Sequence, residues 1–157
     1  MQSHHGIELY GHGTRYVCRC LLSETYIVPP LILIVEDEVI LADSIATYLE
    51  RHAYATAVAY TGEDGLRLAA ENKPDVAVVD LRLPGLDGLK VLQDLREVSP
   101  GTEVLIMTAH ASVATAVEVL QHGAFHYLSK PLDLVDLCAV VAKALSRGRT
   151  RQGLSSP

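Results

Sequence analysis

The stretch Leu31-Ile32-Leu33-Ile34-Val35-Glu36-Asp37-Glu38 decides the fold, because five apolar residues in a row run directly into three acids. A continuous apolar run of this kind is typical of a strand that is buried on both faces, as in a parallel sheet. The residues that follow have the spacing of three and four that marks one face of a helix. They are Ile40, Leu41, Ser44, Ile45, Tyr48 and Leu49. A buried strand followed by such a helix predicts the start of an alternating α/β fold.

The same alternation of strand and helix patterns continues along the chain. Four further strands, each followed by a helical stripe, are expected at 56–60, 76–79, 104–107 and 125–128. The last helix is expected over 134–145. Thr61 and Ser112 are suited to cap two of the helices, because a short hydroxyl side chain can accept a hydrogen bond from a free backbone N–H. Five strands alternating with five helices predict a doubly wound α/β fold, in which a parallel sheet carries helices on both faces.

The side chains that could do chemistry lie where the predicted strands end. Glu36 and Asp37 follow the first strand, and Asp80 ends the third. Thr108 ends the fourth strand, and Lys130 follows the fifth. In doubly wound sheets the ligand lies beyond the carboxyl ends of the strands, where the strand order reverses. The pattern therefore predicts one cluster of carboxylates, a hydroxyl and an ammonium group at that edge of the sheet.

These residue types point to Mg²⁺ and phosphate chemistry. Carboxylates packed together repel each other, and a hard divalent cation removes that cost. Mg²⁺ suits the set, because it prefers oxygen ligands and keeps waters that a phosphate can displace. A carboxylate beside Mg²⁺ can attack phosphorus and become an acyl phosphate, whose oxygens the Lys130 ammonium and the Thr108 hydroxyl could stabilise. Asp80 is the best candidate nucleophile, because the central strand would point it into the middle of the cluster.

Four segments, in this order, resemble the motifs of the receiver domain of two-component response regulators. They are Leu31–Glu38, Asp80-Leu81-Arg82-Leu83-Pro84-Gly85-Leu86-Asp87-Gly88, Met107-Thr108-Ala109 and Tyr127-Leu128-Ser129-Lys130-Pro131. Each motif alone is weak, and their joint order makes the resemblance specific. The sequence is most similar to receivers of the nitrogen-regulator (sigma-54 activator) type, and the fold that it implies is flavodoxin-like, of the receiver type.

The resemblance implies a role for each matching residue in a phosphorylated metal site. Asp80 would accept the phosphoryl group from a sensor histidine kinase or a phosphotransfer protein. Asp37 and Asp80 would ligate Mg²⁺, and Glu36 would assist through water. The backbone carbonyl of Arg82 would complete the ligands that the protein provides. Such a domain is a signalling module with slow autodephosphorylation, and it is not a turnover enzyme.

The resemblance also implies how the site would control a partner. Lys130 would pair with a phosphoryl oxygen, and the Lys130–Pro131 peptide bond would be cis. Thr108 and Tyr127 would be the coupled switch pair, which changes the face built from the fourth helix, fifth strand and fifth helix. The resemblance also implies two partners for this face or domain. They are a second copy of the receiver, bound through this face as a homodimer, and a downstream effector domain.

Composition excludes several other classes of protein. The net charge of −6 disfavours binding to a phosphate backbone, and the basic cluster Arg147, Arg149 and Arg151 lies near the C-terminal end. No apolar run approaches the roughly 18 residues of a membrane-spanning helix. The N-terminus has no apolar stretch typical of a secretory signal, so the cytoplasm is the expected location. We therefore expect no direct nucleic-acid binding by this chain and no membrane association.

The two ends of the chain lie outside the predicted domain, which we place at residues 31–146. Residues 1–30 have no sustained period, so we expect a leader without assigned structure. Residues 147–157 contain glycine and serine and are expected to begin a flexible linker or tail. Cys18 and Cys20 suggest zinc, but their spacing is one residue short of the usual pair and no second pair exists. The histidines that could join them are His4, His5 and His12.

Two alternative functions remain open on the residues alone. A small phosphohydrolase could use an aspartyl-phosphate intermediate, but such enzymes generally place an acid two residues after the nucleophile, where this chain has Arg82. A degenerate receiver could serve only for docking. The complete set of acids, Asp80, Thr108 and Lys130 argues against that alternative.

Overall fold

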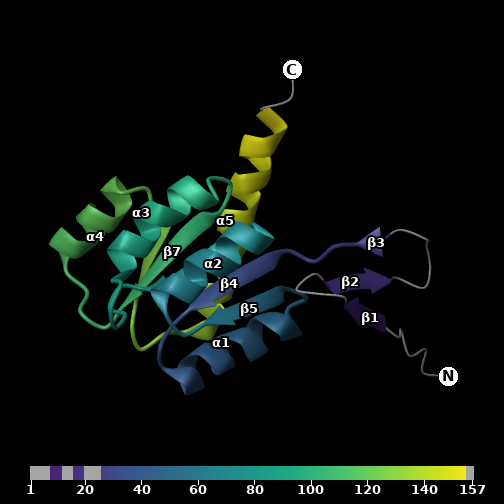
Figure 1. Cartoon of the computed structure of the whole chain (residues 1–157), viewed down its shortest axis with the longest axis horizontal. Coiled ribbons are helices and arrows are strands. Elements are labelled where there is room, and N and C mark those ends of the chain that lie inside the picture. The colour runs from purple at the N-terminus through teal and green to yellow at the C-terminus, as the bar shows by residue number, and fades with distance from the viewer. Residues whose placement is uncertain (1–7, 12–15, 20–25, 155–157) are drawn as a thin grey trace.

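The alternating pattern of the sequence forms one parallel sheet. The computed structural model describes residues 8–11, 16–19 and 26–154 of the chain, and Figure 1 shows how its elements are arranged. From Leu31 onwards the elements are β4 (Leu31–Val35), α1 (Val39–Arg51), β5 (Ala55–Ala59), α2 (Gly62–Asn72), β6 (Val76–Asp80), α3 (Gly88–Val98), β7 (Glu103–Thr108), α4 (Val113–Gln121), β8 (His126–Ser129) and α5 (Leu134–Leu154).

The five strands from β4 to β8 pair in the order β5-β4-β6-β7-β8, and each pair is parallel. The chain passes from β4 to β5 on one side and then returns to β6 on the other. The strand order therefore reverses between β4 and β6, and a ligand in such a sheet lies at this point. With five helices in the described range 26–154, the predicted doubly wound five-stranded fold is confirmed.

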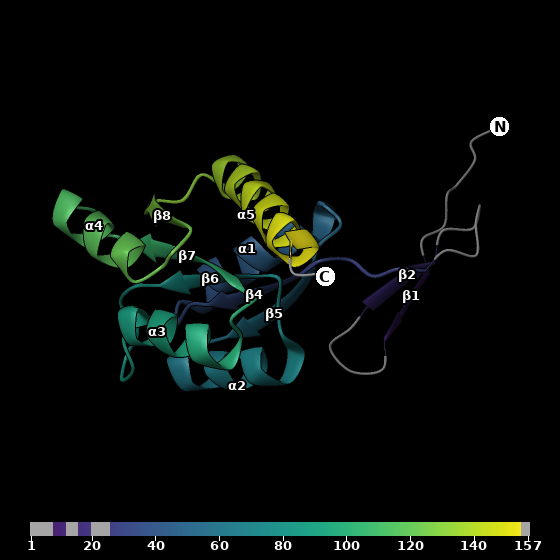
Figure 2. The same ribbon diagram turned by 90° about the horizontal axis from the view of Figure 1, so that it is seen from above.

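Helices cover both faces of this sheet, as Figure 2 shows from above. α1 and α5 pack on one face, and α2 and α3 pack on the other. Successive residues of β4 serve the two faces in turn, because side chains alternate along a strand. Ile32 and Ile34 belong to the core beside α1 and α5, whereas Leu33 and Val35 belong to the opposite core. This explains why the strand reads as one continuous apolar run.

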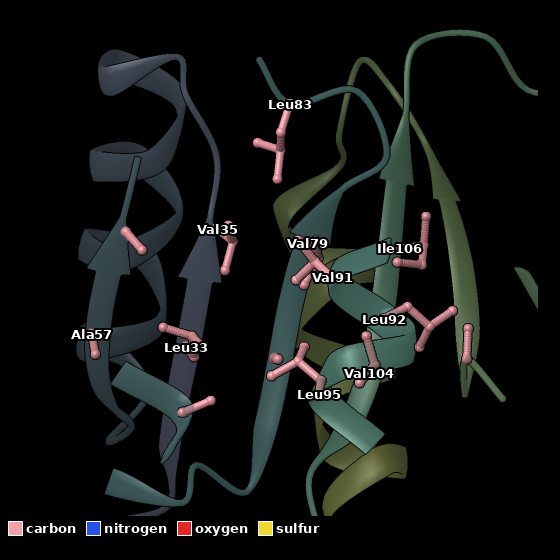
Figure 3. Packing of buried hydrophobic residues seen from close by; sticks show 14 of the residues in the cluster. Leu33, Val35, Ala57, Val79, Leu83, Val91, Leu92, Leu95, Val104 and Ile106 are labelled. Atoms are coloured by element: carbon pink, nitrogen blue, oxygen red, sulfur yellow. The ribbon is translucent and has the colours of Figure 1, made fainter. Parts of the chain in front are cut away.

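The core between the sheet and α3 lies below the carboxyl ends of the central strands (Figure 3). Val79 of β6 and Ile106 of β7 pack in one cluster with Val91, Leu92 and Leu95 of α3. Each fully buried Leu, Ile or Val contributes roughly 1.5–3 kcal/mol relative to an exposed side chain. The strands that end at the functional edge are therefore held by packing on both faces.

Two predicted helix caps are confirmed. The Thr61 hydroxyl accepts a hydrogen bond from the Asp64 N–H at 3.2 Å, and the Ser112 hydroxyl accepts one from the Thr115 N–H at 3.1 Å. Asp87 caps α3 in the same way through the Lys90 N–H at 2.9 Å. Each cap contributes about 0.5–2 kcal/mol, because it satisfies a backbone N–H that the helix leaves free.

The last helix is longer than predicted. The expected flexible linker from residue 147 is wrong for residues 147–154, because α5 continues to Leu154. Arg147 and Arg151 lie one helical turn apart and both reach the carboxylate of Glu103, with nitrogen–oxygen distances of 3.8 and 3.1 Å. The helix continues through Gly148, although glycine has a weak helix preference.

The segment before Pro29 also contains structure that the sequence did not predict. β1 (Glu8–Gly11), β2 (Tyr16–Arg19) and β3 (Tyr26–Ile27) form a separate antiparallel sheet. Strands of four and two residues are too short to show a reliable period in sequence. Of the suggested zinc ligands, His4, His5, His12 and Cys20 lie outside the described residues. In the part of the chain that the structure describes, no helix is long and apolar enough to cross a membrane.

Replacement of Gly88 by alanine should destabilise the domain by about 2 kcal/mol or more. A Cβ atom at Gly88 would collide with the backbone carbonyl oxygen of Asp80 and lie 2.5 Å from Leu81 Cα. The matched control is Gly101→Ala, because a Cβ there meets no atom within 4 Å. Urea unfolding should show a large shift for Gly88→Ala and a change within about 0.5 kcal/mol for Gly101→Ala. Equal shifts would contradict the close approach of α3 to β6.

Candidate functional site

The carboxyl ends of neighbouring strands bring the predicted residues to one edge of the sheet. Glu36 and Asp37 follow β4, and Asp80 ends β6, which pairs directly with β4. Thr108 ends β7, the next strand, and Lys130 directly follows β8. Four of these side chains, those of Glu36, Asp37, Asp80 and Lys130, form one cluster.

Lys130 holds two carboxylates together at the centre of the cluster. Its ammonium donates hydrogen bonds to Glu36 Oε2 at 2.6 Å and to Asp80 Oδ2 at 2.7 Å. The second oxygen of each carboxylate accepts a hydrogen bond from the backbone. Asp80 Oδ1 accepts from the Arg82 N–H and Glu36 Oε1 from the Glu38 N–H, each at 3.0 Å. Both carboxylates are thus fixed in orientation from two sides.

Burial makes this arrangement electrostatically costly. Glu36 is fully buried and Asp80 is 5% exposed. Burial raises the pKa of Glu36 to about 7, against the hydrogen bonds from Lys130 and Glu38 that favour the charged form. Partial burial lowers the pKa of Lys130, but the hydrogen bonds to Asp80 and Glu36 outweigh this effect and raise it above its ordinary value. Lys130 therefore stays charged between its partners.

The same cluster has the donors that a hard divalent cation needs. Glu36, Asp37 and Asp80 each offer a carboxylate oxygen, and these oxygens all lie within 4.8 Å of one another. Asp37 is exposed, so a cation can reach the set from solvent. Three carboxylates face one ammonium group, which leaves negative charge uncompensated. The residues present therefore fit Mg²⁺, which prefers oxygen ligands and retains waters.

Thr108 and Tyr127 lie on adjacent strands beside this cluster. Thr108 is fully buried, and its hydroxyl accepts a hydrogen bond from the His110 N–H at 3.1 Å. Its carbonyl accepts from the Lys130 N–H at 2.8 Å, which ties the end of β7 to the residue that carries the ammonium. Tyr127 is half-buried in β8 and packs against the core beside α3. The Lys130–Pro131 peptide bond is cis, as the resemblance implies.

Two contributions to the site were not recognised in the sequence. Glu36 was expected to assist a metal through water, and it also shares the Lys130 ammonium with Asp80. Strand alternation indicates that Glu36 points inward on the same side as the buried Ile32 and Ile34, but it does not indicate that Glu36 contacts Lys130. The second is Gly88, whose missing side chain allows α3 to begin against the backbone carbonyl of Asp80.

Comparison with known proteins assigns the family. Residues 32–142 match the family described as response regulator receiver domain. The chain belongs to this family. The receiver is 42% identical over 114 residues to the regulatory protein AtoC of Escherichia coli strain K12, an alignment that covers 73% of this chain and 25% of AtoC. It is 39% identical over 118 residues to the transcriptional regulatory protein ZraR of Salmonella typhimurium strain LT2, covering 75% and 27%.

The receiver thus spans about a quarter of the length of these curated relatives. Among solved structures it is similar to a response regulator of Burkholderia pseudomallei that contains a phosphorylated aspartic acid, a calcium ion and citrate. The identity is 31%, the TM-score is 0.69, and the match covers 82% of this chain and 75% of that one. The predicted resemblance to receivers of transcription regulators is confirmed.

Replacement of Asp37 should raise the stability of the protein without Mg²⁺ and weaken its stabilisation by Mg²⁺. Asp37→Asn keeps the shape of the side chain and removes one of three neighbouring negative charges, so it should raise the urea midpoint when Mg²⁺ is absent. Wild-type protein should gain about 2.7 kcal/mol when Mg²⁺ is present at roughly 100 times its Kd, and the variant should lose most of that gain.

Glu118→Gln is the control for Asp37→Asn, because it removes an exposed charge on α4 outside the cluster. Its unfolding should respond to Mg²⁺ as the wild type does. A full Mg²⁺ response in Asp37→Asn would exclude Asp37 as a ligand.

Proposed function

We propose that this receiver accepts a phosphoryl group on Asp80 and acts as a phosphorylation switch in a two-component pathway. The observation that carries the proposal is the position of Asp80. Its Oδ2 lies 2.7 Å from the Lys130 ammonium. Its carboxylate also lies close enough to those of Glu36 and Asp37 for the three to bind one metal ion. A buried carboxylate oriented from two sides and close to positive charge is prepared for attack on phosphorus.

The reaction transfers the phosphoryl group from a phosphohistidine donor to Asp80. A carboxylate oxygen of Asp80 forms a bond to phosphorus, the phosphorus–nitrogen bond breaks, and the imidazole leaves with the electron pair and takes a proton. Lys130 would pair with one phosphoryl oxygen, and the Thr108 hydroxyl would donate to another. Mg²⁺ bound by Glu36, Asp37, Asp80 and the Arg82 carbonyl would supply further positive charge to the transferring group. The donor class is a sensor histidine kinase or a phosphotransfer protein.

The same site can bias the face formed by α4, β8 and α5. The Thr108 hydroxyl that now accepts from His110 would turn towards the phosphoryl group, and Tyr127 would rotate inward. α4 is the element most able to respond, because in its described range 113–121 Val119 alone is buried. Val113, Val117 and Leu120 on this helix are exposed, at 83%, 47% and 47%. Such an apolar face suits a second copy of the receiver or an output domain.

The longer relatives support an output in transcription control. AtoC and ZraR carry the names of a regulatory and a transcriptional regulatory protein, and the receiver matches about a quarter of each. We infer that phosphorylation of Asp80 controls an effector segment joined to this domain or bound by it. The net charge of −6 makes the chain an unfavourable partner for nucleic acid.

Incubation with acetyl phosphate and Mg²⁺ should add one phosphoryl group to the protein. Asp80→Asn should show no adduct by intact mass, because it lacks the nucleophilic oxygen. Asp87→Asn is the matched control, since Asp87 is exposed in the same loop and its cap can be kept by asparagine. Chelation of Mg²⁺ should also prevent the adduct. An unchanged adduct in Asp80→Asn would refute the assignment, as would a wild type that binds neither phosphate nor beryllofluoride.

Replacement of Thr108 by alanine should leave phosphorylation of Asp80 intact and abolish most of the conformational response of α4. Thr108→Ala should still form the adduct on Asp80, because the nucleophile and Lys130 remain. It should lose most of the change in hydrogen–deuterium exchange that beryllofluoride causes over residues 113–121, since the hydroxyl that couples to the phosphate is absent. Thr108→Ser keeps the hydroxyl and should keep the response. A full response in Thr108→Ala would exclude Thr108 as the coupling residue.

A further inference from the structure

We propose that Glu103, Arg147 and Arg151 form an ionic clamp that makes the last turns of α5 a rigid exit arm for the chain. Glu103 begins β7, at the end of the strand opposite Thr108. Its side chain is buried, with 4% exposure for the residue. A buried carboxylate requires a charged or hydrogen-bonding partner, and both of its ionic partners in the structure come from α5.

The clamp begins where apolar packing of α5 ends. The structure describes the side chains of α5 for residues 134–151. Within this range, the buried apolar residues are Leu137, Val141, Ala144 and Leu145. Beyond them, Arg151 Nη1 donates to Glu103 Oε1 at 3.1 Å, and Arg147 Nε lies 3.8 Å from the same oxygen. The Arg147 guanidinium also lies over the Phe125 ring, 5.3 Å from its centroid. Charge thus replaces apolar contact along this part of the helix.

The spacing of the clamp residues fits a helix held on one face. Residues four apart lie on the same side of a helix, so Arg147 and Arg151 can reach one carboxylate together. Gly148 lies between them, and a Cβ atom there would be 4.0 Å from Glu103 Cγ, which shows how closely the helix approaches the start of β7. Glycine in a helix interior is unfavourable. Without Glu103, this segment should therefore fray.

A rigid helix at this position has a consequence for output. Figure 1 shows the last turns of α5 extending past the end of the five-stranded sheet. The helix would therefore carry the chain away from the receiver in a fixed direction as far as Leu154. The clamp lies at the opposite end of β7 from Thr108, so this inference does not depend on the proposed phosphorylation of Asp80.

Hydrogen–deuterium exchange over residues 147–151 of the full chain tests the clamp. Glu103→Gln should accelerate exchange of these amides roughly tenfold and leave β6 protected, because the helix end loses its ionic anchor. High salt should accelerate the same amides in the wild type, and it should have little further effect in the variant. Glu97→Gln, an exposed acid on α3, is the matched control and should change nothing in this segment.

A second pair of variants covers the case in which Glu103→Gln destabilises the whole domain. Arg151→Gln changes the half-exposed partner of the contact and leaves the buried Glu103 unchanged, and it should accelerate exchange. Arg151→Lys keeps the charge and should restore part of the protection. Arg149→Gln removes a charge from the same helix but not from the clamp. Unchanged exchange in folded Glu103→Gln and Arg151→Gln, or an equal effect of Arg149→Gln, would overturn the proposal.

Discussion

The hydrogen bonds of the Lys130 ammonium to Glu36 and Asp80 are the constraint on which the rest of the site depends. They join residues from three places in the chain, next to β4, β6 and β8. A parallel sheet brings these strand ends to one edge, and the reversal of strand order between β4 and β6 opens the position where a ligand can sit. One ammonium cannot balance three carboxylates. The excess negative charge is what would attract a divalent cation to the site.

The fold separates a rigid part from a responsive part. α1 buries Ala42, Ile45, Ala46 and Leu49, so its packing fixes the β4 side of the site. α4 buries Val119 within its described residues and presents apolar side chains to solvent. Elements with few buried contacts open or shift at low cost, whereas well-packed elements hold their position. On the proposed switch, the acids and Lys130 would stay in place while the α4 surface changes.

The sequence predicted those features that depend on local pattern. Continuous apolar runs located the central strands. The acids, Thr108 and Lys130 could be placed because each ends a strand or directly follows one. The end of α5 could not be predicted, because it depends on Glu103, which is distant in sequence from Arg147 and Arg151. The short strands β1 to β3 have too few residues to show a period. Likewise, the shared ammonium of Glu36 and Asp80 depends on a three-dimensional contact that no motif encodes.

β7 carries Thr108 at one end and Glu103 at the other, and all six of its residues are buried. A strand packed on both faces and paired with β6 and β8 cannot stretch or tilt alone, because every displacement would disturb close-packed neighbours. We therefore expect movement of the Thr108 side chain to leave Glu103 in place. The direction in which α5 leaves the domain should be the same with and without phosphate. On the proposed mechanism, a signal from Asp80 would be read at the α4 surface, while the end of α5 would supply the fixed frame against which that change acts.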